Sequence, residues 1–419
     1  MNRTPLSDAL DLSECWRAGL DLHSLMESEL RHSGVLAGTV DVVAVGKCAT
    51  EMANAARTII GDRLRRGLVI GTHPMVPLSE AAWETLVGEH PIPGPGSLAS
   101  ARRLLVFLSE STAEATLFLV SGGASSLCAL PEAPLTTDDL EDVWRAALET
   151  GADITALNQL RAATSSIAGG AVLRHVRTPR SRTLVMVDNV ISGAAWVGSG
   201  LTYNYAPTIE FVETLCASMG VADSSLAERI ADAARSRRHL MEIPVASEYE
   251  NAVLVEPRMM LDLVAREATQ RGYRVVNFGA ALQGDVSEIA GAYAATLHGA
   301  SETAPVCVVG VGEVTIRLET QGRGGRCQEL AWMMAEPLSQ VNRPSAFVAR
   351  ASDGRDFLEG VAGAWVETET MGHINAAGLD WSSVLRAHDS FQGLTAIGQV
   401  LDGSPTGWNL CDLYLLVIG

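Results

Sequence analysis

The sequence contains almost no lysine. Lys47 is the single lysine among 31 basic residues, so the remaining ones are arginines. Lysine is normally one of the commonest residues, and drift towards a GC-rich coding sequence would replace it wherever arginine serves. A lysine that survives such drift marks a position where a planar guanidinium does not replace a compact ammonium. Lys47 is therefore the first candidate functional residue, with a surface lysine that has no role as the alternative.

Long apolar segments and paired cysteines are also missing. No apolar run approaches the roughly 18 residues of a membrane span, and the acidic segment 1–14 lacks the apolar core of a signal peptide. The seven cysteines are scattered and form no Cys-x-x-Cys pair, and the nine histidines form no metal-binding spacing. An odd number of scattered cysteines is typical of free thiols in a reducing compartment. We therefore expect a soluble, cytoplasmic protein.

Positive charge is scarce. With 49 acidic and 31 basic residues, the formal net charge is −18, which argues against nucleic acid or an anionic membrane as a partner. A small anionic substrate would need a locally positive pocket. We expect a small-molecule substrate, and a homodimer is one assembly that such a protein could form. The 47% hydrophobic content and the length of 419 residues are typical of two or three globular domains.

In the first half, short β-branched apolar runs alternate with helical segments. The runs predict strands at 41–45, 68–70, 116–120 and 183–187, and helices over 49–60, 99–109, 137–150 and 154–163. Near-continuous apolar strands in this order predict a parallel sheet covered by helices. Ligands of such sheets bind beyond the carboxyl ends of the strands, where Lys47 and residues 121–126 fall.

The second half repeats an α/β pattern after a helical, arginine-rich stretch from 203 to 250. We place the domain boundary there and expect domains 1–245 and 246–419. Predicted strands lie at 273–278, 306–309, 313–318, 346–349 and 413–418, with helices at 258–271 and 328–334.

Two glycine-containing turns favour anion binding. Val45-Gly46-Lys47 ends a strand before a helix, where backbone N–H groups and the helix dipole attract an anion. In Ser121-Gly122-Gly123-Ala124-Ser125-Ser126, the glycines allow close approach and the hydroxyls supply donors for a phosphate or carboxylate. A plain strand-to-helix turn is the alternative for the second segment, which is neither a P-loop nor a nucleophile elbow.

Gly94 to Ala99 spell Gly-x-Gly-x-x-Ala, the letters of a dinucleotide fingerprint. They follow His90-Pro91-Ile92-Pro93 rather than a predicted strand, so a nicotinamide-dependent reductase is disfavoured.

Charged loops in the second half offer phosphate and metal ligands. Gly322 to Arg326 carry two guanidiniums before a helix, which suits phosphate oxygens, although a solvated basic turn is the alternative. Asp353 and Asp356 follow a predicted strand and are oxygen ligands of the kind that Mg²⁺ prefers. A simple Asp-Gly turn competes with that interpretation.

In this order, the segments of the chain resemble the MOFRL-type glycerate kinases, the D-glycerate 2-kinases that are also labelled hydroxypyruvate reductases. The resemblance covers nearly the whole chain and rests on VGKCATEMANAA, GEHPIPGPGS, LVSGGASSLCALPE, NQLRAATSSIAGG, GEVTIRLETQGRGGRCQELA, ASDGRDFLEGVAGA and SPTGWNLCDLYLLVI. It implies a Rossmann-like parallel-sheet N-terminal domain, a smaller α/β MOFRL C-terminal domain and an active site in the cleft between them.

The resemblance also implies roles for individual residues. Lys47 and Arg326 match the catalytic pair of the family, and Asp353 and Asp356 match its metal-binding carboxylates. Substrate-binding positions match Arg161, His90 and Ser126. Cofactor-binding positions match Ser121, Gly122, Gly123, Ser125, Asn158, Asp188, Glu313, Arg323 and Asn409. ATP and Mg²⁺ are the implied cofactors.

The chain departs from the family pattern at several polar positions. Ala168 replaces a lysine, Ser192 and Gly193 replace two carboxylates, Gly360 replaces a further acid, Phe357 replaces a glycine and Trp408 enters the terminal segment. Fewer acids weaken the binding of Mg²⁺ and nucleotide. The sequence therefore predicts an ATP-dependent phosphotransferase acting on glycerate or a related small hydroxy acid. The alternative is a homologue that retains the fold but performs non-ATP chemistry or binds an anion.

Overall fold

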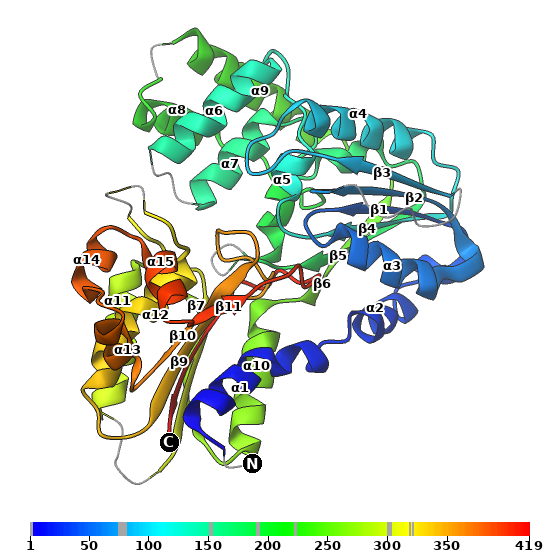
Figure 1. Ribbon diagram of the computed structural model, residues 1–419. Helices are drawn as coiled ribbons and strands as arrows, with labels where there is room; N and C mark the ends of the chain where they lie inside the picture. The colour runs from blue at the N-terminus through cyan, green and yellow to red at the C-terminus, as the bar shows by residue number, and fades with distance from the viewer. Residues whose placement is uncertain are drawn as a thin grey trace. The chain divides into compact units, whose positions relative to one another are not determined.

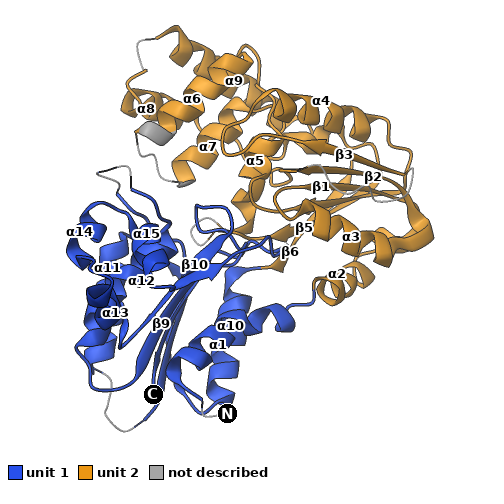
Figure 2. Ribbon diagram, viewed as in Figure 1, with its two compact units in different colours: residues 1–21, 256–419 blue, residues 22–255 orange. Residues whose placement is uncertain are grey.

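The computed structural model describes residues 3–73, 82–150, 154–189, 193–221, 224–299, 304–317, 320 and 322–419. The chain forms two compact units, which we call unit 1 (residues 1–21 and 256–419) and unit 2 (residues 22–255) (Figure 2). No helix among the described residues is long and apolar enough to cross a membrane.

Unit 2 is built on a parallel sheet of six strands in the order β3-β2-β1-β4-β5-β6 (Figure 1). The strands are β1 (Val40–Val45), β2 (Leu64–Gly71), β3 (Trp83–Val87), β4 (Ala115–Val120), β5 (Arg180–Met186) and β6 (Glu248–Val255). The central strands β1 and β4 are buried along their whole length, as their apolar runs predict. This is the Rossmann strand order, and it reverses between β1 and β4, the point where such sheets bind ligands. The predicted fold class is confirmed.

Helices cover both faces of this sheet and form a separate layer at one end of unit 2. They are α2 (Leu22–Arg31), α3 (Ala49–Ile60), α4 (Pro95–Ser109), α5 (Ala124–Leu127), α6 (Thr137–Glu149), α7 (Ile154–Thr164), α8 (Ile209–Ser218) and α9 (Ser225–Glu242), with 3-10 turns η1 (Val35–Ala37), η2 (Gly61–Arg63), η3 (Ala171–His175) and η4 (Ala194–Ser199). Helices α6 to α9 share an apolar core of their own that includes Trp144, Leu160, Val212 and Ile230 (Figure 1).

Unit 1 contains a mixed sheet in the order β11-β10-β9-β12-β8-β7, in which only β7 and β8 are parallel among the described pairs. Its strands are β7 (Arg274–Leu282), β8 (Val306–Gly312), β9 (Ser345–Ala351), β10 (Val361–Glu367), β11 (Val400–Asp402) and β12 (Asp412–Ile418). Its helices are α1 (Pro5–Gly19), α10 (Pro257–Gln270), α11 (Val286–Gly299), α12 (Arg326–Ser339), α13 (Thr370–Ala376), α14 (Trp381–Arg386) and α15 (Ser390–Ala396). Helices α1 and α10 pack together against the sheet, and α11 packs beside α12.

The division of the chain differs from the expected boundary between residues 245 and 246. Strand β6 pairs with β5, so unit 2 extends to Val255. Helix α1 belongs to unit 1 because its Asp8 carboxylate accepts hydrogen bonds from Arg271 Nη1 at 3.0 Å and from the Tyr273 hydroxyl at 2.7 Å. These contacts join positions more than 260 residues apart, which no local pattern in the sequence indicates.

The strand predicted over 313–318 does not form within its described residues. The chain leaves the sheet after Gly312, and residues 318–319 lie outside the described part. The backbone N–H of Val314 donates to the Tyr414 hydroxyl at 3.2 Å, and that of Thr315 donates to the Gly284 carbonyl at 2.9 Å. These loop contacts replace a strand ladder.

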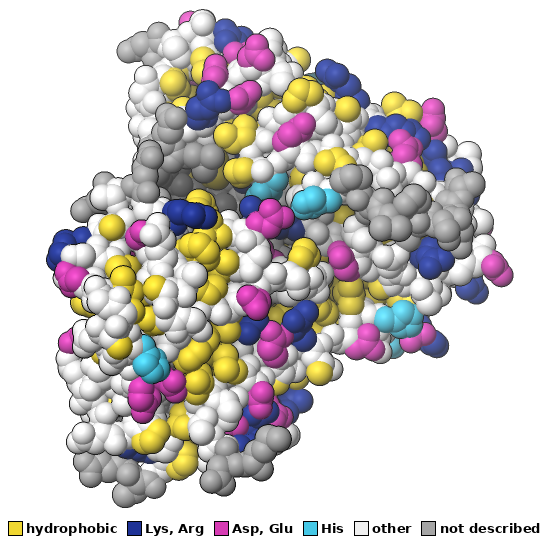
Figure 3. Space-filling view, viewed as in Figure 1, with side chains coloured by type: hydrophobic (Ala, Val, Ile, Leu, Met, Phe, Trp, Pro, Cys, Tyr) yellow, Lys and Arg dark blue, Asp and Glu magenta, His cyan; other side chains and the backbone are white. Residues whose placement is uncertain are grey.

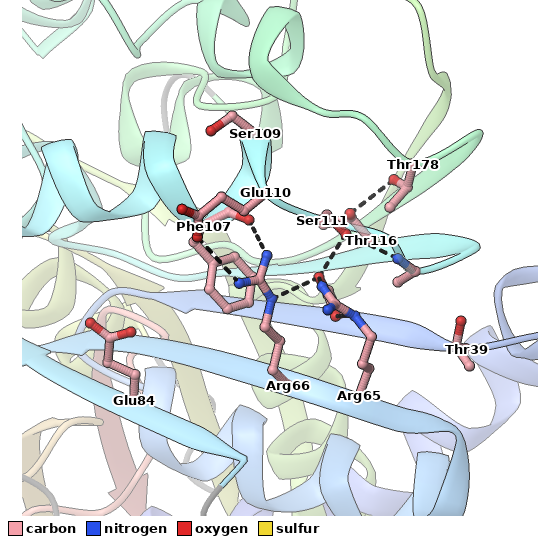
Figure 4. A network of polar contacts seen from close by, with 12 residues as sticks. Thr39, Arg65, Arg66, Glu84, Phe107, Ser109, Glu110, Ser111, Thr116 and Thr178 are labelled. Carbon is pink, nitrogen blue, oxygen red and sulfur yellow. Dashed lines mark hydrogen bonds and ion pairs between the residues drawn. The ribbon is translucent and has the colours of Figure 1, made fainter.

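A buried ion cluster fixes the amino-terminal edge of the parallel sheet (Figure 4). Asp41 on β1 is fully buried and accepts from Arg65 Nε at 2.8 Å and from Arg66 Nε at 3.1 Å. The Ser111 hydroxyl donates to the same carboxylate at 2.7 Å. The two guanidiniums and the hydroxyl compensate the buried charge. This edge therefore has a structural role, at the end of the strands opposite to the one where a ligand is expected.

Candidate active site

The turns that follow β1 and β4 are joined by backbone hydrogen bonds. The N–H of Lys47 donates to the Gly122 carbonyl at 2.9 Å, and the N–H of Ser121 donates to the Val45 carbonyl at 3.0 Å. The buried Ser121 hydroxyl accepts from the N–H of Cys48 at 3.1 Å. The two segments that the sequence singled out thus lie side by side at the topological switch point of the sheet.

Glycine is required at two places in these turns. Gly46 has φ +131°, and a Cβ atom there would lie 2.2 Å from Ser121 Oγ. Gly123 has φ +83°, and a Cβ atom there would lie 3.2 Å from both Lys47 Cγ and His90 Cδ2. The Lys47 and His90 side chains therefore flank Gly123. Lys47 is exposed, and none of the ion pairs among the described residues includes its ammonium, which suits a cation that binds a ligand.

Other predicted residues of unit 2 lie close to these turns. Asp188 follows the carboxyl end of β5, next to β4 in the sheet. The Ser126 hydroxyl, expected to face the substrate, instead donates to the Gly123 carbonyl at 3.1 Å and stabilises the turn. Its buried position explains this use, since an internal partner satisfies the hydroxyl.

A chain of polar contacts joins the Ser121–Ser126 loop to α7. The Ser125 and Ser199 hydroxyls are 2.7 Å apart, and the Ser199 hydroxyl donates to Asn158 Oδ1 at 3.1 Å. Ser199 is fully buried with φ +51°, an unusual conformation for a residue with a side chain. The structure therefore brings together Ser125 and Asn158, two of the predicted cofactor-binding residues, through a serine that was not among the predicted site residues.

Arg161 on α7 lines a pocket next to this chain of contacts. Its guanidinium carbon lies 4.4 Å from the centroid of the Trp144 ring. Burial lowers the pKa of Arg161 to about 10. The lining includes Ser125, Trp144, Arg161, Ser165, Ala168 and Ser199. No ion pair or hydrogen bond joins the Arg161 side chain to another described residue, so its guanidinium has no anionic partner in the described part of the chain.

A second buried guanidinium supports one wall of the pocket. Arg237 is fully buried, and it donates from Nε to the Ala162 carbonyl at 3.1 Å and from Nη2 to the Ala168 carbonyl at 2.6 Å. Burial lowers the pKa of Arg237 to about 10. The N–H of Gly169 donates to the Ser199 carbonyl at 3.0 Å. No local pattern in the sequence indicates a role for Arg237, because its partners are carbonyl groups rather than side chains.

In unit 1, Arg326 begins helix α12 and is held by two carboxylates. Its Nε donates to Asp412 Oδ2 and its Nη1 to Glu313 Oε1, both at 2.5 Å. Burial alone would lower the pKa of Arg326, but the charges of Asp412 and Glu313 outweigh it and raise the pKa above its ordinary value. Arg326 therefore stays charged and fixed in orientation. Asp412, the first residue of β12, was not among the predicted site residues.

Asp356 caps helix α12 and does not fit a metal site. It accepts from the Cys327 N–H at 3.1 Å, from the Gln328 N–H at 2.9 Å and from Gln328 Nε2 at 2.8 Å. Burial and the nearby Asp412 raise its pKa to about 6. Asp353 accepts from the N–H of Arg355 at 2.9 Å in the adjacent turn. Among the described residues, no group of three or more His, Cys, Asp or Glu side chains could hold a metal ion. The residues present thus do not form the predicted Mg²⁺ site.

Two other predicted cofactor-binding residues of unit 1, Arg323 and Asn409, lie in different loops. The Arg323 guanidinium lies 5.2 Å from the Phe391 ring on α15, and the backbone N–H of Arg323 donates to Asp389 Oδ1 at 3.2 Å. These partners differ from those of Arg326. Asn409 lies in the loop before β12, which is attached to the Ser352 turn because the Leu410 N–H donates to Ser352 Oγ at 2.7 Å.

The Gly94–Ala99 segment opens helix α4, but a side chain occupies its N-terminus. Glu89 accepts from the N–H of Gly96 at 3.0 Å and from the N–H and the hydroxyl of Ser97 at 2.8 Å each. Burial would raise the pKa of Glu89, but these hydrogen bonds outweigh it and lower the pKa. The donors that a pyrophosphate would need are therefore already paired with a carboxylate.

Comparisons with known proteins agree with this architecture. Residues 11–234 match the family model described as a domain of unknown function, DUF4147, and residues 306–412 match the MOFRL family. A protein of Agrobacterium vitis, provisionally named hydroxypyruvate reductase, is 30% identical over 91% of this chain and 88% of its own. The D-glycerate 2-kinase of Thermotoga maritima is 27% identical over 90% of each chain.

Solved structures share the fold over the whole chain. The crystal structure of a glycerate kinase from Thermotoga maritima has a TM-score of 0.85 at 24% identity, covering 98% of this chain and 99% of that one. A Pyrococcus horikoshii protein has a TM-score of 0.78 at 23% identity, covering 100% and 99%. Together with the matched family models and the 30% identical relative, which show the family, this means that the chain belongs to the glycerate kinase family, which combines a DUF4147 domain with a MOFRL domain.

Proposed function

We propose that this protein is a kinase that transfers the γ-phosphoryl group of ATP to a hydroxyl of glycerate or a closely related small hydroxy acid. The observation that carries the proposal is the Lys47 turn, in which an unpaired ammonium flanks Gly123 at the switch point of a Rossmann-like sheet. Relatives that match along most of their length are named glycerate kinases, which supports the same activity.

The chemistry of phosphoryl transfer suits these residues. The protein has to position the reactants and neutralise charge on the transferring group rather than form covalent bonds. Lys47 and the backbone of the Ser121–Gly123 turn would bind phosphoryl oxygens, with His90 beside them. Arg161, which has no carboxylate partner among the described residues, would bind the carboxylate of the acid. In unit 1, Arg326 is oriented by Asp412 and Glu313 and is the second residue that the family resemblance assigns to catalysis.

We do not propose that carboxylates of the protein bind a magnesium ion. Both carboxylate oxygens of Asp356 already accept N–H donors, and Asp353 is engaged in its own turn. We therefore assign no step to a metal held by these residues. ATP remains the proposed phosphate donor.

The reductase name that some relatives carry is not supported by the geometry. The Glu89 carboxylate occupies the N-terminus of α4, the place where a dinucleotide pyrophosphate would have to bind.

A second candidate function is anion binding without transfer, which the replacement of family acids by residues such as Gly193 and Gly360 favours. We also propose a cytoplasmic location, since the seven cysteines, all within the described part of the chain, form no disulfide. Acidic and basic side chains are interspersed on the face in Figure 3, which supports a small-molecule substrate rather than nucleic acid.

The test is an assay of ADP release with Mg-ATP and glycerate, combined with ³¹P NMR of the product. We expect a new phosphate ester and equal amounts of ADP, and no ester with Lys47→Ala. Binding of glycerate measured by calorimetry, with no ADP above the ATP-only background, would contradict the kinase and favour the anion-binding candidate.

A further inference from the structure

Two segments of unit 1 fit closely against one another. They are the arginine-rich loop 322–326 and the segment 387–391, which links α14 to α15. A Cβ atom at Gly322 would overlap the carbonyl oxygen of Ala387, and one at Gly324 would overlap a side-chain oxygen of the same segment. Glycine is therefore needed at both positions, because the backbone of the loop approaches the segment so closely.

Arg323, between these two glycines, is held by the 387–391 segment through three contacts. Its backbone N–H donates to Asp389 Oδ1 at 3.2 Å, and its carbonyl accepts from the N–H of Phe391 at 2.9 Å. Its guanidinium lies 5.2 Å from the centroid of the Phe391 ring, within the range of cation–π attraction. Arg323 is exposed, and no ion pair among the described residues includes it. It is thus an oriented cation whose charge remains available to an anionic ligand.

His388 attaches the 387–391 segment to helix α12. Its Nδ1 lies 2.7 Å from Oε1 of Glu329, which is buried on the first turn of the helix that Arg326 begins. His388 has φ +53°, an uncommon conformation for a residue with a side chain. Such a conformation persists where the surrounding contacts determine it. The bond to Glu329 therefore holds the segment against the helix that carries Arg326.

We propose that Phe391 and His388 are positioning residues that act through Arg323. Phe391 orients the Arg323 guanidinium for binding the phosphate groups of ATP, and His388 holds the segment to which Phe391 belongs. The inference rests on the proposed function, in which ATP is the phosphate donor. A guanidinium that is already oriented loses less rotamer freedom when it binds a phosphate. Loss of the ring should therefore weaken ATP binding roughly threefold to tenfold and leave the KM for glycerate unchanged.

The experiment measures the Kd of ATP by calorimetry without acceptor, and the KM values of ATP and glycerate from ADP release. Phe391→Leu removes the ring and should raise the Kd and KM of ATP only. Phe391→Tyr keeps the ring and should retain the wild-type values. Phe211→Leu changes another half-buried phenylalanine, on α8 in unit 2, and is the matched control.

Two variants test the anchor. His388→Ala removes the hydrogen bond to Glu329 and should raise the same two constants for ATP. His388→Asn should restore them, because asparagine tolerates the left-handed conformation and its amide nitrogen is bonded to Cγ as Nδ1 of histidine is. Rescue by asparagine separates this role from a general need for a large side chain at position 388.

The outcomes separate the inference from the proposed function. A wild-type affinity for ATP in Phe391→Leu, or an equal rise in the KM of glycerate, overturns the role of Phe391 and leaves the kinase intact. Failure of asparagine to restore ATP binding overturns the role of His388. If the wild type binds ATP but forms no phosphate ester, the proposed transfer fails, and the affinities for ATP still decide the inference. Absence of ATP binding by the wild type overturns both.

Discussion

The backbone N–H of Lys47 donates to the carbonyl oxygen of Gly122 at 2.9 Å. This bond joins the turn after β1 to the turn after β4 although the two residues are 75 positions apart. It fixes the Lys47 backbone, while the side chain remains exposed beside Gly123. A side-chain ammonium without an ion-pair partner, on a backbone that is fixed in place, is suited to binding a ligand rather than to stabilising the fold.

Lys47→Arg should therefore abolish turnover without affecting the fold. The guanidinium keeps the charge but is larger and planar, so it cannot place a compact donor at the same point. We expect kcat to fall by roughly a hundredfold or more, and the free energy of unfolding to change by less than about 0.5 kcal/mol. Steady-state kinetics and urea unfolding measure the two quantities. Full activity of the variant would exclude a specific role for the ammonium.

The scarcity of lysine provides an independent test. An amine-reactive reagent can modify only one side chain, Lys47, besides the terminal amine. We expect one labelled peptide containing Lys47 by mass spectrometry, loss of activity in proportion to that label, and protection by ATP. Labelling of Lys47 with activity retained would show that the ammonium does not contact the reacting groups.

Gly46→Ala should destabilise the protein strongly. An alanine Cβ there would lie 2.2 Å from Ser121 Oγ and 2.5 Å from the Ser121 carbonyl oxygen, in a backbone conformation with φ +131°. We expect a loss of about 2–4 kcal/mol in the free energy of unfolding. Gly34→Ala is the matched control, because Gly34 lies in the left-handed region with φ +39° and the nearest atom to its Cβ would be Arg180 Nη1 at 3.6 Å. It should cost only about 1 kcal/mol, and equal losses in the two variants would contradict the steric explanation.

The turn around Lys47 could be predicted because its signals are local. The apolar run of β1, the glycine and the following helix α3 stand next to one another in the sequence, and α3 spans the predicted residues 49–60. Strand β4 and the Ser121–Gly123 turn could be predicted for the same reason, because their signals also stand next to one another in the sequence. The parallel direction of these strands followed from the α/β alternation, since parallel strands need helical crossovers, whereas the order of the strands was not predicted.

The remaining features depend on contacts between distant positions. Asp356 was predicted to bind a metal because it follows a predicted strand and matches a carboxylate of the family, and only the folded chain shows that it caps α12. Helix α1 lies beside α10 because Asp8 pairs with Arg271 and Tyr273. Arg161 and Arg237 are both arginines near apolar segments, and their different roles arise from which carbonyl groups the fold brings to Arg237.

Stability should depend on pH through Asp356. Its pKa in the folded protein, about 6, lies above the ordinary value of 3.8, so the folded state binds this proton more tightly than the unfolded state. This contribution is fully present below about pH 4 and is lost as the pH rises to about 6, by up to about 3 kcal/mol. Asp356→Asn has no such proton. We expect the difference in unfolding free energy between wild type and variant to change over this pH range, measured by urea titration. A difference that is constant from pH 4 to 7 would contradict the raised pKa.

Asp41→Ala should destabilise unit 2 without altering catalysis. The substitution leaves the Arg65 and Arg66 guanidiniums, whose side chains are 31% and 21% exposed, without the buried carboxylate that they share. Removing one partner of a buried ion cluster costs about 3–5 kcal/mol. Glu27→Ala breaks the exposed pair between Glu27 and Arg31 and should cost less than about 0.5 kcal/mol. Because Asp41 lies at the amino-terminal edge of the sheet and Lys47 follows the carboxyl end of the same strand, kcat/KM of folded Asp41→Ala protein should match wild type. A large loss of kcat/KM in protein that is still folded would show that the two edges of the sheet are coupled.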